Sequence, residues 1–205
     1  MPRFPAISPE DAAGRAKELL DGVQATLGMI PNLMRTMANS PAVLEAYLSF
    51  KGALAMGSLP ATLREQIALT VAEVNGCDYS LAAHSAVGKV VGLSHQDILD
   101  SRQGTSPASR VEAALQFAQT LVYQRGWVGD REVARLRRAG YGDGEIAEIV
   151  ANVALNLFST YFNHVAGTVV DFPEVRPSAS RRFGPGAHLD PVGPRDDSLA
   201  VTQCS

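Results

Sequence analysis

Helical periodicity with clear stops is the feature that most constrains the fold of this chain of 205 residues. Apolar residues recur at the spacing of an α-helix, and no sustained alternation typical of β-strands is present. Most helical segments follow Ser, Asp or Pro and end at Gly, which suits short connections between packed helices. The expected helices cover residues 8–28, 40–57, 60–76, 78–92, 106–124, 130–140 and 143–167. The sequence therefore predicts an all-α fold.

The chain length favours one domain with a substantial core. Residues 1–175 carry the helical patterns and are expected to form this domain. Residues 176–205 are rich in Pro, Gly, Ser and Arg and lack a helical period, which predicts a C-terminal tail. The net charge is −3 and the basic residues are scattered. Neither nucleic acid nor a membrane surface is therefore an expected partner, because both require clustered cationic residues.

Membrane and export signals are also absent from the sequence pattern. The first 20 residues lack the apolar core of a signal peptide, and no later run reaches the roughly 18 apolar residues of a membrane span. A cytoplasmic protein is expected. The cysteines are Cys77 and Cys204, too few for a disulfide framework, so Cys77 is expected to be free for other uses.

The stretch NGCDYSLAAH, residues 75–84, carries side chains suited to chemistry. Cys77 is predicted at the start of a helix, where free backbone N–H groups and the helix dipole lower a thiol pKa. Cys77, Ser80 and His84 share one face of that helix, and residues four apart can touch. The pattern favours a reactive thiol close to an imidazole.

Glu65 lies on the preceding predicted helix, among alanines and a leucine. Partial burial on this face would raise the pKa of the carboxyl toward the acid–base range unless a cation lies beside it. The two helices are joined at Asn75 and Gly76 and should pack antiparallel. Glu65 could then reach His84 directly or through water, giving a proton relay that ends at positions 77 and 80.

Each of these residues also has a structural interpretation. Cys77 could be a small core residue, His84 a hydrogen-bonded packing histidine, and Glu65 half of a buried ion pair with an arginine. A metal site is not expected, because one Cys and one His seven residues apart do not form a closed site. The residues alone leave catalytic and structural roles open.

Two further side chains are possible pocket residues. His164 is predicted on the apolar face of the helix over 143–167, where it either completes the pocket or packs as a hydrogen-bonded histidine. Tyr79 lies on a different helical face from Cys77, and packing is its expected role. A polar stripe is predicted on the other side of the last helix, to hydrogen-bond across a subunit contact or to face water; it consists of Glu148, Asn152, Asn156, Ser159 and Asn163.

The spacing of Glu65, Cys77, position 80 and His84 resembles the Glu-x11-Cys-x2-Cys-x3-His signature of the alkylhydroperoxidase D and carboxymuconolactone decarboxylase superfamily. Three longer stretches resemble its peroxidase-related branch, and the similarity covers roughly residues 8–175; the stretches are 28–54, 59–84 and 155–173. The resemblance implies an all-α helical bundle of the alkylhydroperoxidase D type, a homotrimer or homohexamer, and an active site near the paired helices that needs no cofactor.

The resemblance also implies roles for the motif residues. In redox members the second cysteine attacks the peroxide, the first resolves the sulfenic acid as a disulfide, and the Glu and His relay protons. On this chain Cys77 would be the resolving thiol, Glu65 and His84 the relay, and Ser80 the attacking position. A hydroxyl cannot form a sulfenic acid, so the dithiol cycle cannot run as in those members. Ser80 is either an engineered replacement that traps a dithiol peroxidase or a natural residue.

Three hypotheses follow. The first is a thiol-dependent (alkyl hydro)peroxidase-like antioxidant enzyme with CxxS in place of CxxC, in which Cys77 is the remaining redox thiol. It would use hydrogen peroxide or an organic hydroperoxide and a dithiol reductant, and Cys204 is a further candidate to resolve oxidised Cys77. The alternative is a cofactor-independent carboxymuconolactone decarboxylase-like lyase or isomerase with Glu65 and His84 as acid and base. The third is a helical oligomer with a vestigial pocket that serves a partner protein.

Overall fold

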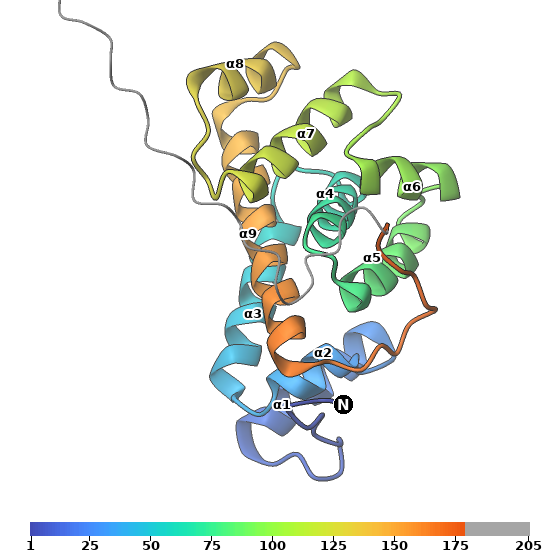
Figure 1. Ribbon diagram of the computed structural model, residues 1–205. Helices are drawn as coiled ribbons and strands as arrows, with labels where there is room; N and C mark the ends of the chain where they lie inside the picture. The colour runs from blue at the N-terminus through green and yellow to red at the C-terminus, as the bar shows by residue number, and fades with distance from the viewer. Residues whose placement is uncertain (179–205) are drawn as a thin grey trace, which may run out of the picture.

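The computed structural model describes residues 1–178, and within that range it contains helices and no strands (Figure 1). The all-α prediction is thereby confirmed. Cys204 and the part of the predicted tail after residue 178 lie outside the described residues. The helices are α1 (Gly14–Leu27), α2 (Asn32–Met37), α3 (Pro41–Ala55), α4 (Ala61–Val74), α5 (Asp78–Val90), α6 (His95–Gln103), α7 (Ser109–Tyr123), α8 (Asp130–Arg138) and α9 (Asp143–Ala166).

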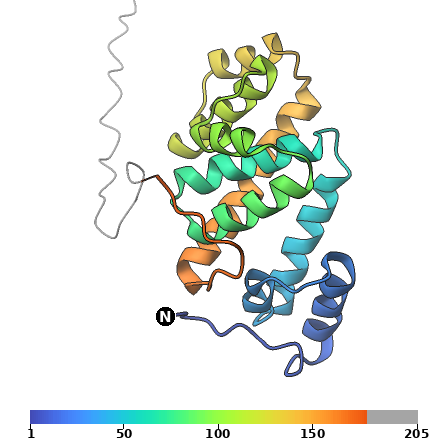
Figure 2. The ribbon, with the colours of Figure 1, turned by 90° about the vertical axis from the view of Figure 1, so that its right-hand side faces the viewer.

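Helix α4 is the centre of the fold, and α5, α6, α7 and α9 pack around it (Figures 1 and 2). Ten of its 14 residues are buried. Ile67 and Val71 face a core shared with α7, α8 and α9, whereas Leu69 faces a smaller core shared with α5 and α6. A helix enclosed in this way needs apolar residues on more than one side, which is why α4 shows more than one apolar face.

Helices α1, α2 and α3 form a second part of the fold beside α4, α5 and α9 (Figure 2). Their core includes Leu20, Met37 and Leu44, each at most 1% exposed. Leu155 of α9 and Cys77, at the start of α5, belong to the same apolar cluster. The space between this part and the α4–α5 pair is where the candidate site lies.

The sequence pattern predicts that the first helix begins at Ser8, but α1 begins at Gly14. The Ser8 carbonyl accepts hydrogen bonds from the N–H groups of Asp11 and Ala12, both at 3.1 Å, and the Ser8 hydroxyl donates to the Asp11 carboxylate at 2.6 Å. These bonds close one isolated turn. The backbone is then extended at Ala13, with φ −133° and ψ 159°, and Gly14, the first residue of α1, has a left-handed φ of +53° that suits glycine.

Helices α2 and α6 are missing from the sequence prediction. Helix α6 begins with a capping box, in which the Ser94 hydroxyl accepts from the Asp97 N–H and the Asp97 carboxylate accepts from the Ser94 N–H. This signal was present in the sequence. Helix α2 has only six residues, too few for a periodic pattern to be recognised.

Residues 168–178 form a C-terminal strap that returns from the end of α9 past α2 toward α5 and α6 (Figure 1). Near its start, the Asp171 carboxylate accepts from the backbone N–H of Asn32 at 2.6 Å. At its end, the Ser178 N–H donates to Glu73 at 2.7 Å. Glu73 is buried at 1% exposure and also pairs with Arg102 at 2.8 Å. The strap is thus held at both ends.

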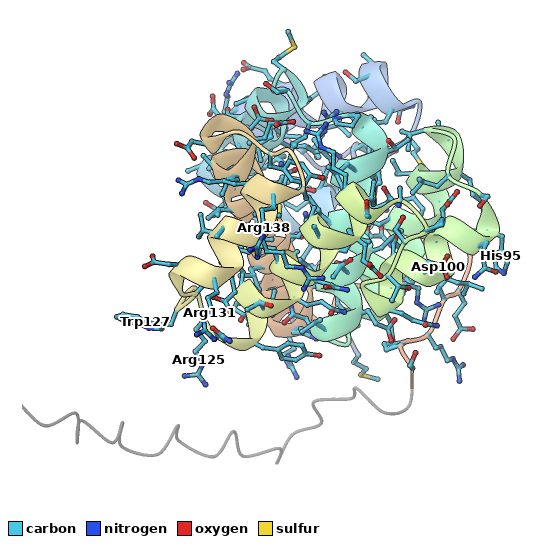
Figure 3. The ribbon with its side chains drawn as sticks, turned by 90° about the horizontal axis from the view of Figure 1, so that it is seen from above. His95, Asp100, Arg125, Trp127, Arg131 and Arg138 are labelled. Atoms are coloured by element: carbon cyan, nitrogen blue, oxygen red, sulfur yellow. The ribbon has the colours of Figure 1, made fainter. Side chains whose placement is uncertain are left out.

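The outer helices carry charged surface. Arg131 and Arg138 on α8 are exposed, as is His95 at the start of α6, which lies at the edge of the molecule in Figure 3. None of the helices formed by residues 1–178 combines the length and apolar character needed to cross a membrane.

Candidate active site

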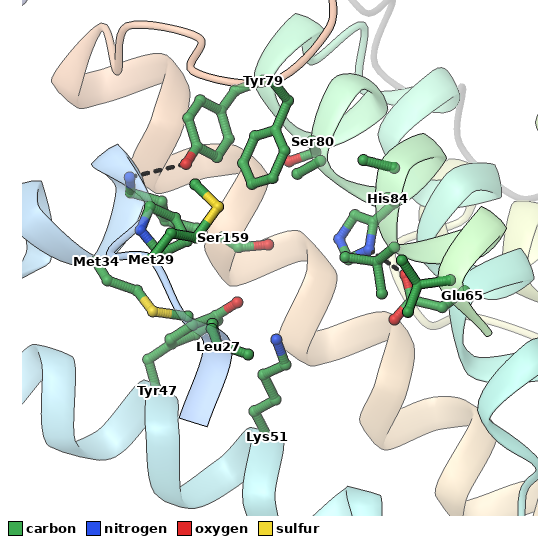
Figure 4. Close-up of a pocket in the computed structure, with 17 residues that line it drawn as sticks. Leu27, Met29, Met34, Tyr47, Lys51, Glu65, Tyr79, Ser80, His84 and Ser159 are labelled. Atoms are coloured by element: carbon green, nitrogen blue, oxygen red, sulfur yellow. Dashed lines mark hydrogen bonds and ion pairs between the residues drawn. The ribbon is translucent and has the colours of Figure 1, made fainter. Parts of the chain in front are cut away.

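A cavity of about 470 Å³ lies between the α1–α3 part of the fold and the α4–α5 pair (Figure 4). This volume is within the range of small-molecule sites. Most of the lining side chains are apolar: Leu27, Met29, Pro31, Leu33, Met34, Ala83, Ala86, Val87, Val90 and Phe172. The polar lining residues are Tyr47, Lys51, Glu65, Tyr79, Ser80, His84 and Ser159. The composition is that of a site for a small organic molecule with few polar groups.

Glu65 and His84 meet at one wall of this cavity. The two helices that carry them are joined by a tight turn in which Gly76 has a left-handed φ of +62°. Oε2 of Glu65 lies 2.7 Å from Nδ1 of His84, a direct contact of the kind expected from the antiparallel packing. The two side chains are 16% and 20% exposed. The cavity therefore contains a carboxylate–imidazole pair with limited access to water.

The environment of Glu65 keeps its carboxyl ionised. Burial by itself would raise the pKa of Glu65, but the charge and hydrogen bond of His84, together with the charges of Lys51 and Arg64, lower it below its ordinary value. Cationic side chains beside Glu65 thus prevent the increase in pKa that burial alone would cause. Glu65 serves as a fixed negative charge next to the imidazole.

The contact with Glu65 decides which nitrogen of His84 is available. A carboxylate that accepts from Nδ1–H selects the tautomer with its lone pair on Nε2 and fixes the orientation of the ring. No residue within 1–178 forms a hydrogen bond with Nε2. Figure 4 shows the ring at the cavity, with the Glu65 contact on one side. Nε2 can therefore accept a proton from a bound molecule.

Cys77 lies behind the cavity and does not line it. It is the N-cap of α5, 2% exposed, within the apolar cluster of the α1–α3 part. Burial raises the pKa of this thiol, although its hydrogen bonds with Ser80 and Asn163 oppose the increase. The expectation of a lowered thiol pKa is therefore wrong, because loss of solvation outweighs the favourable helix start.

Ser80 does line the cavity. Its hydroxyl accepts from the thiol of Cys77 and from the side-chain amide of Asn163, each at 3.3 Å. These two donors occupy the oxygen and leave the hydroxyl hydrogen for another acceptor. Within residues 1–178 no hydrogen bond connects Ser80 or Cys77 with His84. The expected relay exists from Glu65 to His84 and does not continue to positions 77 and 80.

Tyr79 is placed at the cavity and His164 is not. The Tyr79 hydroxyl accepts from the backbone N–H of Leu33 at 3.0 Å, burial raises its pKa, and its ring contacts Phe172 edge-on at 5.9 Å. It therefore joins α5 to α2 and to the strap. His164 is exposed and contacts the carbonyl of Asn75 through Nε2 at 3.0 Å, which corrects its assignment as a pocket residue.

The polar stripe of α9 faces the interior, contrary to the expectation of solvent or a subunit contact. Asn152, Asn156 and Asn163 are 3–5% exposed. The side-chain amides of Asn152 and Asn156 donate to carbonyls of their own helix, each at 2.8 Å, so burial leaves these donors satisfied. Asn163 uses its amide to hold Ser80. Ser159, from the same stripe, lines the cavity.

Tyr47 and Lys51 on α3 are cavity residues that the sequence reasoning missed. They lie four residues apart, on one face of their helix. The only sequence signal was a lysine in an otherwise largely apolar helix, and its importance depends on the placement of α3 opposite α5. No group of three His, Cys, Asp or Glu residues within the described range is arranged to hold a metal ion.

The helical bundle with a Glu–His pair at an apolar cavity is an alkylhydroperoxidase D-like fold, as comparison with solved structures shows. An uncharacterized peroxidase-related protein with an alkylhydroperoxidase AhpD core, from Ralstonia eutropha JMP134, is 23% identical with a TM-score of 0.72. The alignment covers 88% of this chain and 94% of that chain. A peroxidase-related protein from Silicibacter sp. TM1040 is 21% identical with a TM-score of 0.71, covering 87% and 92%.

The debrominase Bmp8, solved in complex with 2,3,4-tribromopyrrole, is 20% identical with a TM-score of 0.71, and the alignment covers 82% of this chain and 91% of that one. Residues 41–122 match the Carboxymuconolactone decarboxylase family, a segment that includes Glu65, Cys77, Ser80 and His84. Over this segment the chain is similar to the Carboxymuconolactone decarboxylase family, and its fold is alkylhydroperoxidase D-like. No curated protein matches it.

Proposed function

We propose that the chain is a cofactor-independent acid–base enzyme, a lyase or isomerase that acts on a small, largely apolar carbonyl compound. The observation that carries the proposal is the contact between Glu65 and His84 at the wall of the cavity, together with the exclusion of Cys77 from that wall. An acid–base pair faces the ligand space, and the thiol does not.

The proposed reaction uses Nε2 of His84 as the base. It takes a proton from a carbon next to a carbonyl group, and the electron pair of the broken C–H bond moves onto the carbonyl oxygen to give an enolate. Glu65 stabilises the resulting imidazolium through Nδ1. Return of the proton to another carbon of the same molecule completes an isomerisation. General acid–base catalysis of this kind contributes roughly 10²–10⁴-fold to a rate.

Decarboxylation can use the same residues. A β-keto carboxylate loses CO₂, the electrons of the C–C bond form the enolate, and protonated His84 supplies the proton that replaces the carboxyl group. The largely apolar walls limit the contact of the Glu65–His84 pair with water and so strengthen its interaction in either reaction.

The proposal can be tested with a panel of unsaturated lactones, cyclic ketones and β-keto acids in D₂O, followed by NMR for deuterium incorporation, isomerisation and CO₂ loss. His84→Gln should lower the rate roughly 10²–10⁴-fold, the usual contribution of a general base. Glu65→Gln should also slow the reaction, because it removes the charge that orients the ring and stabilises the imidazolium.

Cys77→Ala is the decisive companion variant, since it removes the thiol without changing the cavity lining. The proposed function requires Cys77→Ala to keep most of the activity. Loss of activity in Cys77→Ala, with retention in His84→Gln, would exclude the acid–base mechanism. Circular dichroism of each variant separates chemical effects from unfolding.

A thiol-dependent peroxidase is the second candidate, favoured by the 3.3 Å separation between Sγ of Cys77 and Oγ of Ser80. A cysteine at position 80 would place one sulfur at the cavity and another directly behind it. Its thiolate could attack a hydroperoxide, releasing an alcohol or water and forming a sulfenic acid. Cys77 would then displace water to form a disulfide, which a dithiol reductant returns to two thiols.

Ser80→Cys tests this candidate. The variant should consume hydrogen peroxide or an organic hydroperoxide with a dithiol reductant, and the additional change Cys77→Ala should prevent disulfide formation. In the chain with Ser80, peroxidase activity would require a sulfenic acid at Cys77 that dimedone can trap. Absence of that adduct at stoichiometric peroxide would eliminate a monothiol peroxidase.

A further inference from the structure

Two side chains of α3 reach into the cavity on the side away from the Glu65–His84 pair (Figure 4). They are Tyr47 and Lys51, four residues apart on one helical face. Figure 4 places the Lys51 ammonium between Tyr47 and the Glu65–His84 pair. An oxygen-bearing ligand in the cavity would therefore have hydrogen-bond donors on α3 and the base on α5.

Tyr47 is built into the wall as a neutral donor. The residue is 7% exposed, its ring packs against Phe158 with the ring centres 6.3 Å apart, and burial raises the pKa of its hydroxyl. No hydrogen-bond partner for the hydroxyl is found within residues 1–178. A buried hydroxyl at a cavity surface without a protein partner is available to a ligand.

Lys51 supplies positive charge to an otherwise largely apolar space. The titratable groups of other helices that line the same cavity or the adjoining one are Glu65 of α4, Tyr79 and His84 of α5, and Glu18 of α1. None of the carboxylates in residues 1–178 lies within ion-pair distance of Lys51. Its charge nevertheless acts on both Glu65 and Tyr47. A ligand anion can therefore bind Lys51 without displacing an existing salt bridge.

We propose that Tyr47 and Lys51 form an oxyanion-binding arm, which holds the negative oxygen of a small apolar ligand on α3 and turns its acidic carbon toward His84. The inference rests on the proposed acid–base function and deepens it. The Tyr47 hydroxyl donates a hydrogen bond to the enolate oxygen that forms when His84 takes the proton, and Lys51 compensates the charge. The ligands selected are those with a phenolate-like or enolate-like oxygen on a compact apolar body.

Binding of 4-nitrophenol tests the arm without any turnover. Its ring suits the apolar walls, its phenolate oxygen resembles an enolate, and its anion is yellow whereas the neutral form is nearly colourless. We expect the protein to bind the anion more tightly than 4-nitroanisole, which has the same ring and no ionisable oxygen. Bound probe should therefore remain yellow at a pH where the free probe is mostly neutral.

Lys51→Met should weaken phenolate binding about tenfold, the effect of losing a hydrogen bond to a charged group. Lys51→Arg should restore most of the affinity because the charge remains. Tyr47→Phe should weaken binding by a similar factor. Lys89→Met and Tyr123→Phe are matched controls on exposed residues outside the cavity lining and should leave binding unchanged. Unchanged 4-nitroanisole binding shows that the cavity of each variant is intact.

Equal affinity for 4-nitrophenol and 4-nitroanisole would overturn the inference. So would phenolate binding that survives Lys51→Met and is lost in His84→Gln, since the anion would then bind the imidazolium. The oxyanion-binding arm and the proposed acid–base function can be refuted independently of each other. Phenolate binding through Lys51 with no proton exchange in any substrate would refute the acid–base enzyme alone, and exchange that is unaffected by Tyr47→Phe and Lys51→Met would refute the arm alone.

Discussion

Replacing Arg102 by Met should destabilise the protein strongly, because it leaves the Glu73 carboxylate buried without its cationic partner. Glu73 is 1% exposed on the central helix, and Arg102 of α6 pairs with it at 2.8 Å. The Arg102 side chain is 14% exposed and also donates to the carbonyl of Arg176 at 2.7 Å. The variant would keep the bond from the Ser178 N–H to Glu73 and lose both arginine contacts.

The size of the effect follows from this burial. Removing one partner of a buried ion pair costs about 3–5 kcal/mol, whereas an exposed pair contributes about 0–1 kcal/mol. For a chain of this size, each kcal/mol lowers the midpoint of thermal unfolding by about 2–4 °C, so the expected decrease is roughly 6–20 °C. Arg137→Met is the matched control, because Arg137 and Asp143 form a pair that is 60% and 80% exposed.

Urea unfolding followed by circular dichroism measures both variants. The double variant Glu73→Gln with Arg102→Met should recover part of the lost free energy of unfolding, since it removes the unpaired charge. If Arg102→Met costs no more than Arg137→Met, the reasoning from burial is refuted. If the double variant is no more stable than Arg102→Met, the contact of Arg102 with the strap, and not its ion pair with Glu73, determines the stability.

Three other changes have defined outcomes. Ser94→Ala should cost about 1 kcal/mol in thermal unfolding through loss of the α6 cap, and a shift indistinguishable from zero would contradict the capping role. Gly104→Ala should destabilise by about 1–2 kcal/mol because φ is +75°, whereas Gly22→Ala, inside α1 with open space around it, should stabilise by about 0.5–1 kcal/mol. The folded pKa of Glu65 lies below its ordinary value of 4.5, so its pairing with His84 stabilises the fold above that pH and is lost as pH falls through the folded pKa. The stability difference between wild type and Glu65→Gln, measured by unfolding, should therefore shrink on acidification below pH 4.5, and a constant difference would contradict this pKa.

The sequence was sufficient for the parts of the fold that depend on local pattern. The long helices were recognisable from their periodicity and from stops such as Gly28 and Gly167, which adopt the expected left-handed conformation. The approach of Glu65 to His84 was also predictable, because a short turn forces adjacent helices to pack antiparallel. Both inferences depend only on residues or helices that are adjacent in the sequence.

The features that were missed depend on tertiary packing. Which face of α9 is buried could not be read from hydropathy, because Asn152 and Asn156 satisfy their own amides within the helix. Cys77 does lie at a helix start, as the sequence predicts, but the burial that raises the pKa of its thiol comes from α1–α3, α9 and the strap. Lys51 became a cavity residue only through the position of α3.

The residues that line the cavity come from separate parts of the chain. Glu65 and His84 belong to the enclosed α4–α5 pair, whereas Met29, Met34 and Phe172 come from the first helices and from the strap. Methionine side chains adapt readily to new shapes, and substitutions at these positions leave the carboxylate–imidazole contact untouched. The first helices and the strap can therefore alter the shape of the ligand space, while the α4–α5 pair that carries the carboxylate and the imidazole stays the same.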